Sequence, residues 1–159
     1  MKHTLSVLVE NKPGVLQKAA SLFSRRGFNI ESLAVGTTED ESISRMTIVV
    51  AGDDKVLEQI TKQLYKLIDV IRVFDIPKDN IIDRELILLR VNAPTSTRKE
   101  LTELIDMYKG HIVDVAEDSI IIEITGDSEK VEGFKKLLEK FGIKELVRTG
   151  KIALQRGTE

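Results

Sequence analysis

The sequence contains no cysteine and no tryptophan among its 159 residues, and aromatic side chains make up only 4% of it. Without cysteine the chain has no disulfide, no thiolate metal ligand and no thiol nucleophile. The scarcity of aromatic side chains argues against a surface on which nucleic-acid bases stack. Lysine and arginine number 24 against 26 aspartates and glutamates, so the net charge of −2 attracts neither nucleic acid nor an anionic membrane.

Long apolar runs are missing as well. No segment approaches the ~20 consecutive apolar residues that a membrane-spanning helix needs. The polar start of the chain, residues 1–4, also lacks the pattern of a signal peptide. We therefore expect a cytoplasmic protein with no membrane partner and one or two globular domains.

The N-terminal part of the chain changes its apolar period at Pro13 and Gly14. Apolar side chains alternate along residues 5–10, which indicates a strand, and recur at helical spacing along residues 15–23. Gly27 then follows two arginines, an arrangement typical of a helix end with a left-handed cap. The sequence thus predicts a strand and a helix joined by a tight turn.

This turn is a candidate site for a small anion. A helix start leaves backbone N–H groups without partners. Gly14 lets a ligand approach that backbone, and the helix dipole favours a carboxylate there. The alternative is that Asn11 and Pro13 only start the helix, as such residues often do.

The rest of the first half continues the alternation of strands and helices. The apolar phase slips by one residue near Glu31 and Ser32, which predicts a β-bulge in the second strand. Apolar periodicity then predicts a strand over 46–50, a helix over 56–67 and a strand over 70–74. The predicted order is strand, helix, strand, strand, helix, strand.

The same order begins again after residue 82. A possible capping box from Thr97 to Glu100 starts the first helix of the repeat, and a further strand is predicted over 151–155. We therefore predict an α+β protein with two ferredoxin-like βαββαβ domains, each a four-stranded antiparallel sheet with two helices on one face. The predicted divisions are a first domain over 1–77, a linker over 78–82 and a second domain over 83–159.

Each predicted sheet has open edges and an uncovered face. In the first domain that face carries Leu8 and Val49, which a monomer would expose to water. A domain of this size also buries only ~60% of its unfolded surface. Because pairing between chains would cover such edges and faces, we expect at least a homodimer.

No catalytic or metal-binding constellation is present in the sequence. His3 and His111 stand alone, and no nucleophile triad, phosphate loop or dinucleotide fingerprint occurs. An acylphosphatase-like enzyme of this fold would need an essential arginine in the first loop, which reads Asn-Lys-Pro-Gly here. An amino-acid-sensing module remains compatible, with polar groups and an apolar wall supplied by Asn11, Gly14, Asn29, Leu16, Ile30 and Val35.

Several segments resemble one family closely. They are residues 5–14 (LSVLVENKPG), 22–33 (LFSRRGFNIESL), 44–48 (SRMTI), 56–64 (VLEQITKQL), 66–70 (KLIDV) and 84–86 (REL). Together they resemble the small subunit of acetolactate synthase with its N-terminal ACT domain. The resemblance is most specific in the first half of the chain. The second half resembles the family mainly in its layout as a second domain and in residues 84–86.

This resemblance implies an effector site between two paired ACT domains, which favours the anion-site interpretation of the first turn. The turn of one chain would face the second strand of the other, and the bound effector would be valine or another branched-chain amino acid. The implied effector-binding residues are Asn11, Lys12, Pro13, Gly14, Val15, Leu16, Asn29, Ile30 and Val35.

The resemblance also implies a regulatory subunit without chemistry of its own. Its partner would be the large catalytic subunit, which carries thiamine diphosphate, magnesium and FAD, whereas this chain would hold no cofactor or metal. The small subunit is expected to activate that partner and to confer feedback inhibition in valine, leucine and isoleucine biosynthesis. The alternative is a free-standing ACT-type sensor that regulates another enzyme or transcription.

Overall fold

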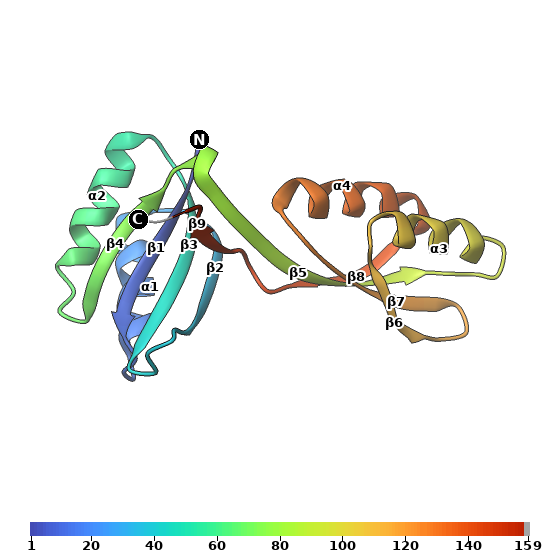
Figure 1. Ribbon diagram of the computed structural model, residues 1–159, viewed down its shortest axis with the longest axis horizontal. Coiled ribbons are helices and arrows are strands. Elements are labelled where there is room, and N and C mark those ends of the chain that lie inside the picture. Colours follow the sequence, from blue (N-terminus) through green and yellow to red (C-terminus); the bar gives the residue numbers. More distant parts are fainter. Residues whose placement is uncertain (158–159) are drawn as a thin grey trace. The chain divides into compact units, whose positions relative to one another are not determined.

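The computed structural model describes residues 1–157, and their contacts divide the chain into two units (Figure 1). Unit 2 runs from Asp83 to Gly150, and unit 1 combines Met1–Ile82 with the described C-terminal residues 151–157. The sequence-based boundary placed residues 151–159 in the second domain. The structure groups their described part, residues 151–157, with the first unit instead.

Unit 1 contains an antiparallel sheet with the strand order β2-β3-β1-β4. Its elements follow the predicted order: β1 (Lys2–Glu10), α1 (Val15–Arg26), β2 (Ile30–Thr37), β3 (Ile43–Ala51), α2 (Asp54–Tyr65) and β4 (Val70–Ile76). The predicted bulge is present, because the pairing of β2 with β3 shifts register between Ile30 and Ser32. The two βαβ crossovers leave β2 at one edge of the sheet and β4 at the other.

The core of unit 1 lies between this sheet and its two helices. Alternate residues of the central strand β1, such as Leu5 and Val7, are fully buried in it, together with apolar residues of α1 and α2. The start of α2 is fixed by Asp53, whose side chain accepts a hydrogen bond from the Val56 N–H at 3.0 Å. The helix-facing side of the sheet is therefore packed as the periodicity predicts.

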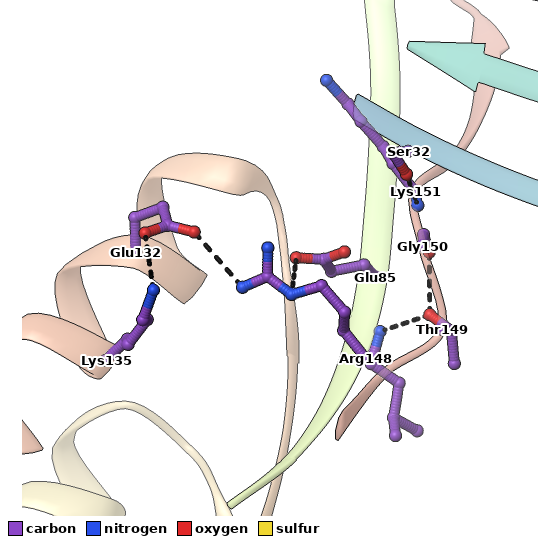
Figure 2. A network of polar contacts seen from close by, with 9 residues as sticks. Ser32, Glu85, Glu132, Lys135, Arg148, Thr149, Gly150 and Lys151 are labelled. Carbon is purple, nitrogen blue, oxygen red and sulfur yellow. Dashed lines mark hydrogen bonds and ion pairs between the residues drawn. The ribbon is translucent and has the colours of Figure 1, made fainter. Parts of the chain in front are cut away.

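The second face of this sheet is covered more than the sequence predicts, although Leu8 on it is only half-buried. Val49 is buried on it, and so are the side chains of Ser6 and Thr47. The described C-terminal segment reaches this face, because the Lys151 N–H donates to Oγ of Ser32, which pairs with Val49 (Figure 2). The chain's own C-terminal segment thus lies against part of the sheet face that we expected a second chain to cover.

That covering strand is β9 (Ile152–Gln155), which pairs with β5 (Ile81–Asn92). A 3-10 turn, η1 (Lys78–Asn80), leads into β5, and the Arg156 N–H donates to the Asn80 carbonyl oxygen at 2.8 Å. The predicted linker over 78–82 is therefore a structured turn and the beginning of a strand.

Unit 2 repeats the same topology with the strand order β6-β7-β5-β8. Its further elements are α3 (Arg98–Met107), β6 (His111–Val115), β7 (Ser119–Gly126), α4 (Ser128–Leu138), η2 (Glu139–Phe141) and β8 (Ile143–Arg148). Phe134 is fully buried at its centre, with its ring centroid 5.1 Å from that of Tyr108. The prediction of two ferredoxin-like domains is confirmed, with β9 as an additional strand on β5.

Polar contacts mark the end of β8 (Figure 2). Arg148 lies between Glu132 and Glu85, with nitrogen-to-oxygen distances of 3.3 Å and 3.8 Å. Thr149 Oγ1 accepts a hydrogen bond from the Leu86 N–H and donates one to the Gly150 carbonyl oxygen. These contacts fix the last residues of unit 2 against β5, just before the chain continues into β9.

Candidate functional site

The turn between β1 and α1 is fastened to the loop between β2 and β3. The backbone N–H of Asn11 donates to the Ser42 carbonyl oxygen at 2.8 Å. Its side-chain Nδ2 donates to the Glu41 carbonyl oxygen at 3.0 Å. Asn11 therefore positions the turn through two carbonyl groups of the neighbouring loop.

Gly14 precedes the first residue of α1 in a left-handed conformation, with φ of 85°. A Cβ atom added to it would meet no atom of residues 1–157 within 4 Å, so these residues leave the space beside this backbone open. Within residues 1–157 no protein acceptor pairs with the backbone N–H groups of Leu16 and Gln17 in the first turn of the helix. The arrangement offers free backbone donors to an anion at the positive end of the helix.

Two lysines flank this turn, and each is engaged in an ion pair. Lys12 Nζ lies 2.9 Å from Glu10 Oε2, and Lys18 Nζ lies 3.2 Å from Oδ2 of the buried Asp69. The hydrogen bond to Glu10 and its negative charge raise the pKa of Lys12. A ligand carboxylate would therefore meet the helix N–H groups directly and would reach Lys12 only in competition with Glu10.

The loop that receives Asn11 is held by a small polar network. Asp40 Oδ1 accepts hydrogen bonds from Oγ and the backbone N–H of Ser42, and Thr38 Oγ1 accepts one from the Asp40 N–H. These bonds from Ser42 lower the pKa of Asp40. The Thr-x-Asp-x-Ser spacing of Thr38, Asp40 and Ser42 is typical of such side-chain turns.

We expect the order of this loop to depend on pH in the acid range. Because the folded-state pKa of Asp40 is lowered, its bonds are complete at neutral pH and are lost as the pH falls through that lowered pKa. An NMR titration of the Asp40 carboxyl should have its midpoint below that of an unfolded aspartate, and the Asn11 side-chain amide should shift with it. Ser42→Ala should move the midpoint back toward the ordinary value. A midpoint that is ordinary in the unsubstituted chain would contradict this prediction.

The structure places the predicted site residues in two separate regions of one chain. Asn11 to Leu16 form the turn and the start of α1, whereas Asn29 precedes β2 at the opposite end of the sheet. The strand register shows this separation. Ile30 pairs with Val50 near one end of β3, whereas Thr37 pairs with Ser44 near the other end. Eight strand residues span about 25 Å, so one chain does not bring Asn29 to the turn.

The apolar residues of the predicted wall are accessible to different degrees. Leu16 is 46% exposed on the first turn of α1, and Val35 is 45% exposed on the edge strand β2. Ile30 is half-buried against the core. Val35 pairs with the buried Met46, so it lies on the helix-covered side of the sheet.

The described residues contain no cluster of metal-ligating side chains. No group of three or more histidines, aspartates or glutamates is arranged to hold a metal ion among them. His3 is buried in β1, with Nδ1 3.3 Å from Asp75 Oδ2, and its Nε2 has no hydrogen-bond partner within residues 1–157. In the described part of the chain, no helix combines the length and the apolar character needed to cross a membrane.

Comparison with known proteins decides the family. The model for the AHAS small subunit-like ACT domain matches residues 5–72, and the model for the small subunit of acetolactate synthase matches residues 84–157. The chain belongs to the acetolactate synthase small subunits. Its two units thus coincide with the ACT domain and the C-terminal domain of that family, apart from the β9 segment.

Individual members of the family match over more than nine-tenths of their length. The probable acetolactate synthase small subunit of Archaeoglobus fulgidus is 59% identical over 159 residues, which cover 100% of this chain and 99% of the relative. The acetolactate synthase small subunit of Mycobacterium leprae is 52% identical over 155 residues, covering 98% and 92%. The crystal structure of the Thermotoga maritima acetolactate synthase small subunit superposes with a TM-score of 0.92 at 44% identity, covering 100% and 99%.

Proposed function

We propose that this chain is the regulatory subunit of an acetolactate synthase and binds a branched-chain amino acid, valine foremost, between two paired ACT domains. The observation that carries the proposal is the β1–α1 turn, where Gly14 leaves the backbone open and the N–H groups of Leu16 and Gln17 lack acceptors among the described residues. The full-length likeness to small subunits favours this role over that of a free-standing sensor.

Edge-to-edge pairing of two chains would complete the site. The edge strand β2 ends at Thr37, beside the loop that holds Asn11, and begins at Ile30, next to Asn29. In an antiparallel two-fold pairing of β2 with its copy, Ile30 of one chain lies opposite Thr37 of the other. Asn29 of one chain then comes close to the turn of its partner, which neither chain achieves alone.

Each part of valine has a chemically suitable group in this arrangement. The α-carboxylate would accept from the free N–H groups of α1, and the ammonium would donate to the side-chain oxygen of Asn29 from the other chain. Leu16 and Val35 would contact the branched side chain. Leucine differs by one methylene, so the site discriminates against it by only ~1–3 kcal/mol.

A ligand held by two chains is suited to regulation. Valine would stabilise the pairing geometry in which both halves of the site meet, and it would thereby shift the population of that state. The catalytic subunit, which carries thiamine diphosphate, magnesium and FAD, would respond to this shift. The activated and the inhibited enzyme would then be the valine-free and the valine-bound states of one complex.

Reconstitution with the catalytic subunit of the same organism tests this function. The chain alone should form no acetolactate from pyruvate, its addition should raise the rate of the catalytic subunit, and valine should lower the rate only in the complex. Acetolactate formation by the chain alone would contradict the proposal. A catalytic rate that is unaffected by the chain, together with saturable valine binding, would instead support a free-standing sensor.

A further inference from the structure

Unit 2 contains a cavity of about 420 Å³ at the point where β5 ends and α3 begins. Its size falls within the range of small-molecule sites, roughly 300–1,000 Å³. The lining residues come from four parts of the unit and are Asn92, Pro94, Thr97, Asp118, Lys140 and Phe141. The function proposed above does not use this cavity.

One side of the cavity is fixed by Arg98. Its guanidinium donates to the Ala93 carbonyl oxygen at 2.6 Å and to the carbonyl oxygens of Ala116 and Glu117 at 2.7 Å each. The Ala93 N–H also donates to the Asp118 carbonyl oxygen at 2.8 Å. These bonds connect the β5–α3 turn with the β6–β7 loop, so the two walls they form are held together.

The other side is fixed by contacts between β5 and the segment after α4. The Asn92 N–H donates to the Gly142 carbonyl oxygen at 3.0 Å. Gly142 has φ of 91°, and a Cβ atom on it would come within 2.4 Å of Asn92 Nδ2. The positive φ favours glycine at this position. The preceding residues Lys140 and Phe141 line the cavity together with Asn92.

The lining presents both signs of charge. Lys140 Nζ lies 2.6 Å from Glu100 Oε1 and 5.1 Å from the centre of the Phe141 ring. The Asp118 carboxylate makes no hydrogen bond or ion pair with residues 1–157. The predicted capping box is absent, since Thr97 makes no side-chain cap bond and Glu100 pairs with Lys140. The cavity therefore has a cation, an anion without a protein partner and an uncapped helix start around one space.

The backbone bonds of this region repeat those of the first unit. The bond from Ala93 to Asp118 corresponds to the bond from Asn11 to Ser42, and the bond from Asn92 to Gly142 corresponds to the bond from Glu10 to Asp69. In each unit these two bonds connect the end of the first strand with two segments: the loop between the second and third strands, and the residues just before the fourth strand. In unit 2, however, the lining residues of the cavity all belong to one chain.

We propose that this cavity binds a free α-amino acid as its zwitterion, at a site separate from the one in unit 1. Lys140 and the first N–H groups of α3 receive the carboxylate, with Lys140 released from Glu100. Asp118 accepts the ammonium group, and Pro94 and Phe141 contact the amino-acid side chain. A simple anion satisfies only half of these groups, whereas a zwitterion satisfies both charges.

NMR titration of the ¹⁵N-labelled full chain with each standard L-α-amino acid in turn tests this site. At least one amino acid should shift the amides of Ala93, Asp118 and Gly142 in a saturable manner, and it should do so equally in the Gly14→Asp chain. Asp118→Asn and Lys140→Met should each weaken the binding about tenfold or more. Lys99→Met is the matched control, because Lys99 is an exposed lysine on α3 outside the lining, and it should leave the binding unchanged.

Three outcomes would overturn the proposal. The first is the absence of saturable shifts at these amides with every amino acid. The second is an equal response to propionate, which has a carboxylate but no ammonium group and would reveal a plain anion site. The third is unchanged binding in the Asp118→Asn chain with its spectrum otherwise preserved. None of these results bears on the valine site of unit 1, whose residues lie in the other domain.

Discussion

Gly14→Asp is expected to weaken valine binding at least about a hundredfold and to abolish valine inhibition of the reconstituted enzyme. The new carboxylate would lie beside the open helix N-terminus, where it would repel the valine carboxylate and take its N–H donors. No atom of the described residues lies within 4 Å of the new Cβ, so the chain should remain folded. Calorimetric titration with valine measures the loss, and circular dichroism measures the folding.

Three control variants separate charge from backbone strain. Gly14→Ala and Gly14→Asn place a neutral side chain at the same φ of 85°, so they should keep more binding than Gly14→Asp. Gly27→Asp places the same charge at the other end of α1, at φ of 70° and again with no atom within 4 Å. It should retain valine inhibition. Normal valine binding in Gly14→Asp would remove the turn from the site.

Phe134→Ala is expected to destabilise unit 2 by about 3–5 kcal/mol, because it empties a fully buried position packed against Tyr108. Such a loss is a large part of the stability of a small domain. Leu137→Ala is the matched control, since Leu137 lies on the same helix but is 41% exposed. It should cost much less. Denaturant unfolding of both variants measures the difference.

Hydrogen exchange on the Phe134→Ala chain also tests the division of the chain. Amides of β7 should lose protection, whereas those of β1 and β3 should keep it, since these strands belong to a different core. Amides of β9 should behave like those of β1, because residues 151–157 group with unit 1. Loss of protection in β9 together with β7 would contradict this grouping and would support the sequence-based boundary.

Local features of the fold were predictable because neighbouring residues determine them. The change of apolar period at Pro13 marks the β1–α1 turn, and the slip near Ser32 marks the bulge in β2. Buried apolar residues repeat at strand or helix spacing, and this repeat identified both βαββαβ units. Chain order and sheet topology follow from these local signals.

The features that sequence analysis missed depend on contacts between distant segments. β9 pairs with β5, about seventy residues earlier, and nothing in its short apolar pattern specifies that partner. The capping box at Thr97 fails because Glu100 pairs with Lys140, forty positions away. Val49 is buried, although its face was predicted to be open, because the C-terminal segment reaches that side of the sheet.

The candidate site was predictable only in part, for the same reason. The composition of the turn identified Asn11 and Gly14, whereas the loop at Asp40 and Ser42 that holds Asn11 was missed. Asn29 was a candidate because of its polar side chain, whereas its place opposite the turn of a second chain came only from the resemblance to a family. One chain places Asn29 at the far end of β2, so the site proposed above requires a second copy of the chain.

Complementation between two defective chains tests this dependence most directly. Gly14→Asp damages the turn and Asn29→His damages the opposite wall, so neither homodimer should bind valine. In an equimolar mixture half of the dimers contain one chain of each kind, and each of these has one intact site of two. Calorimetry should then recover about a quarter of the valine sites of the unsubstituted protein. No recovered binding, with mixed dimers verified by native mass spectrometry, would show that the site is not shared between two chains.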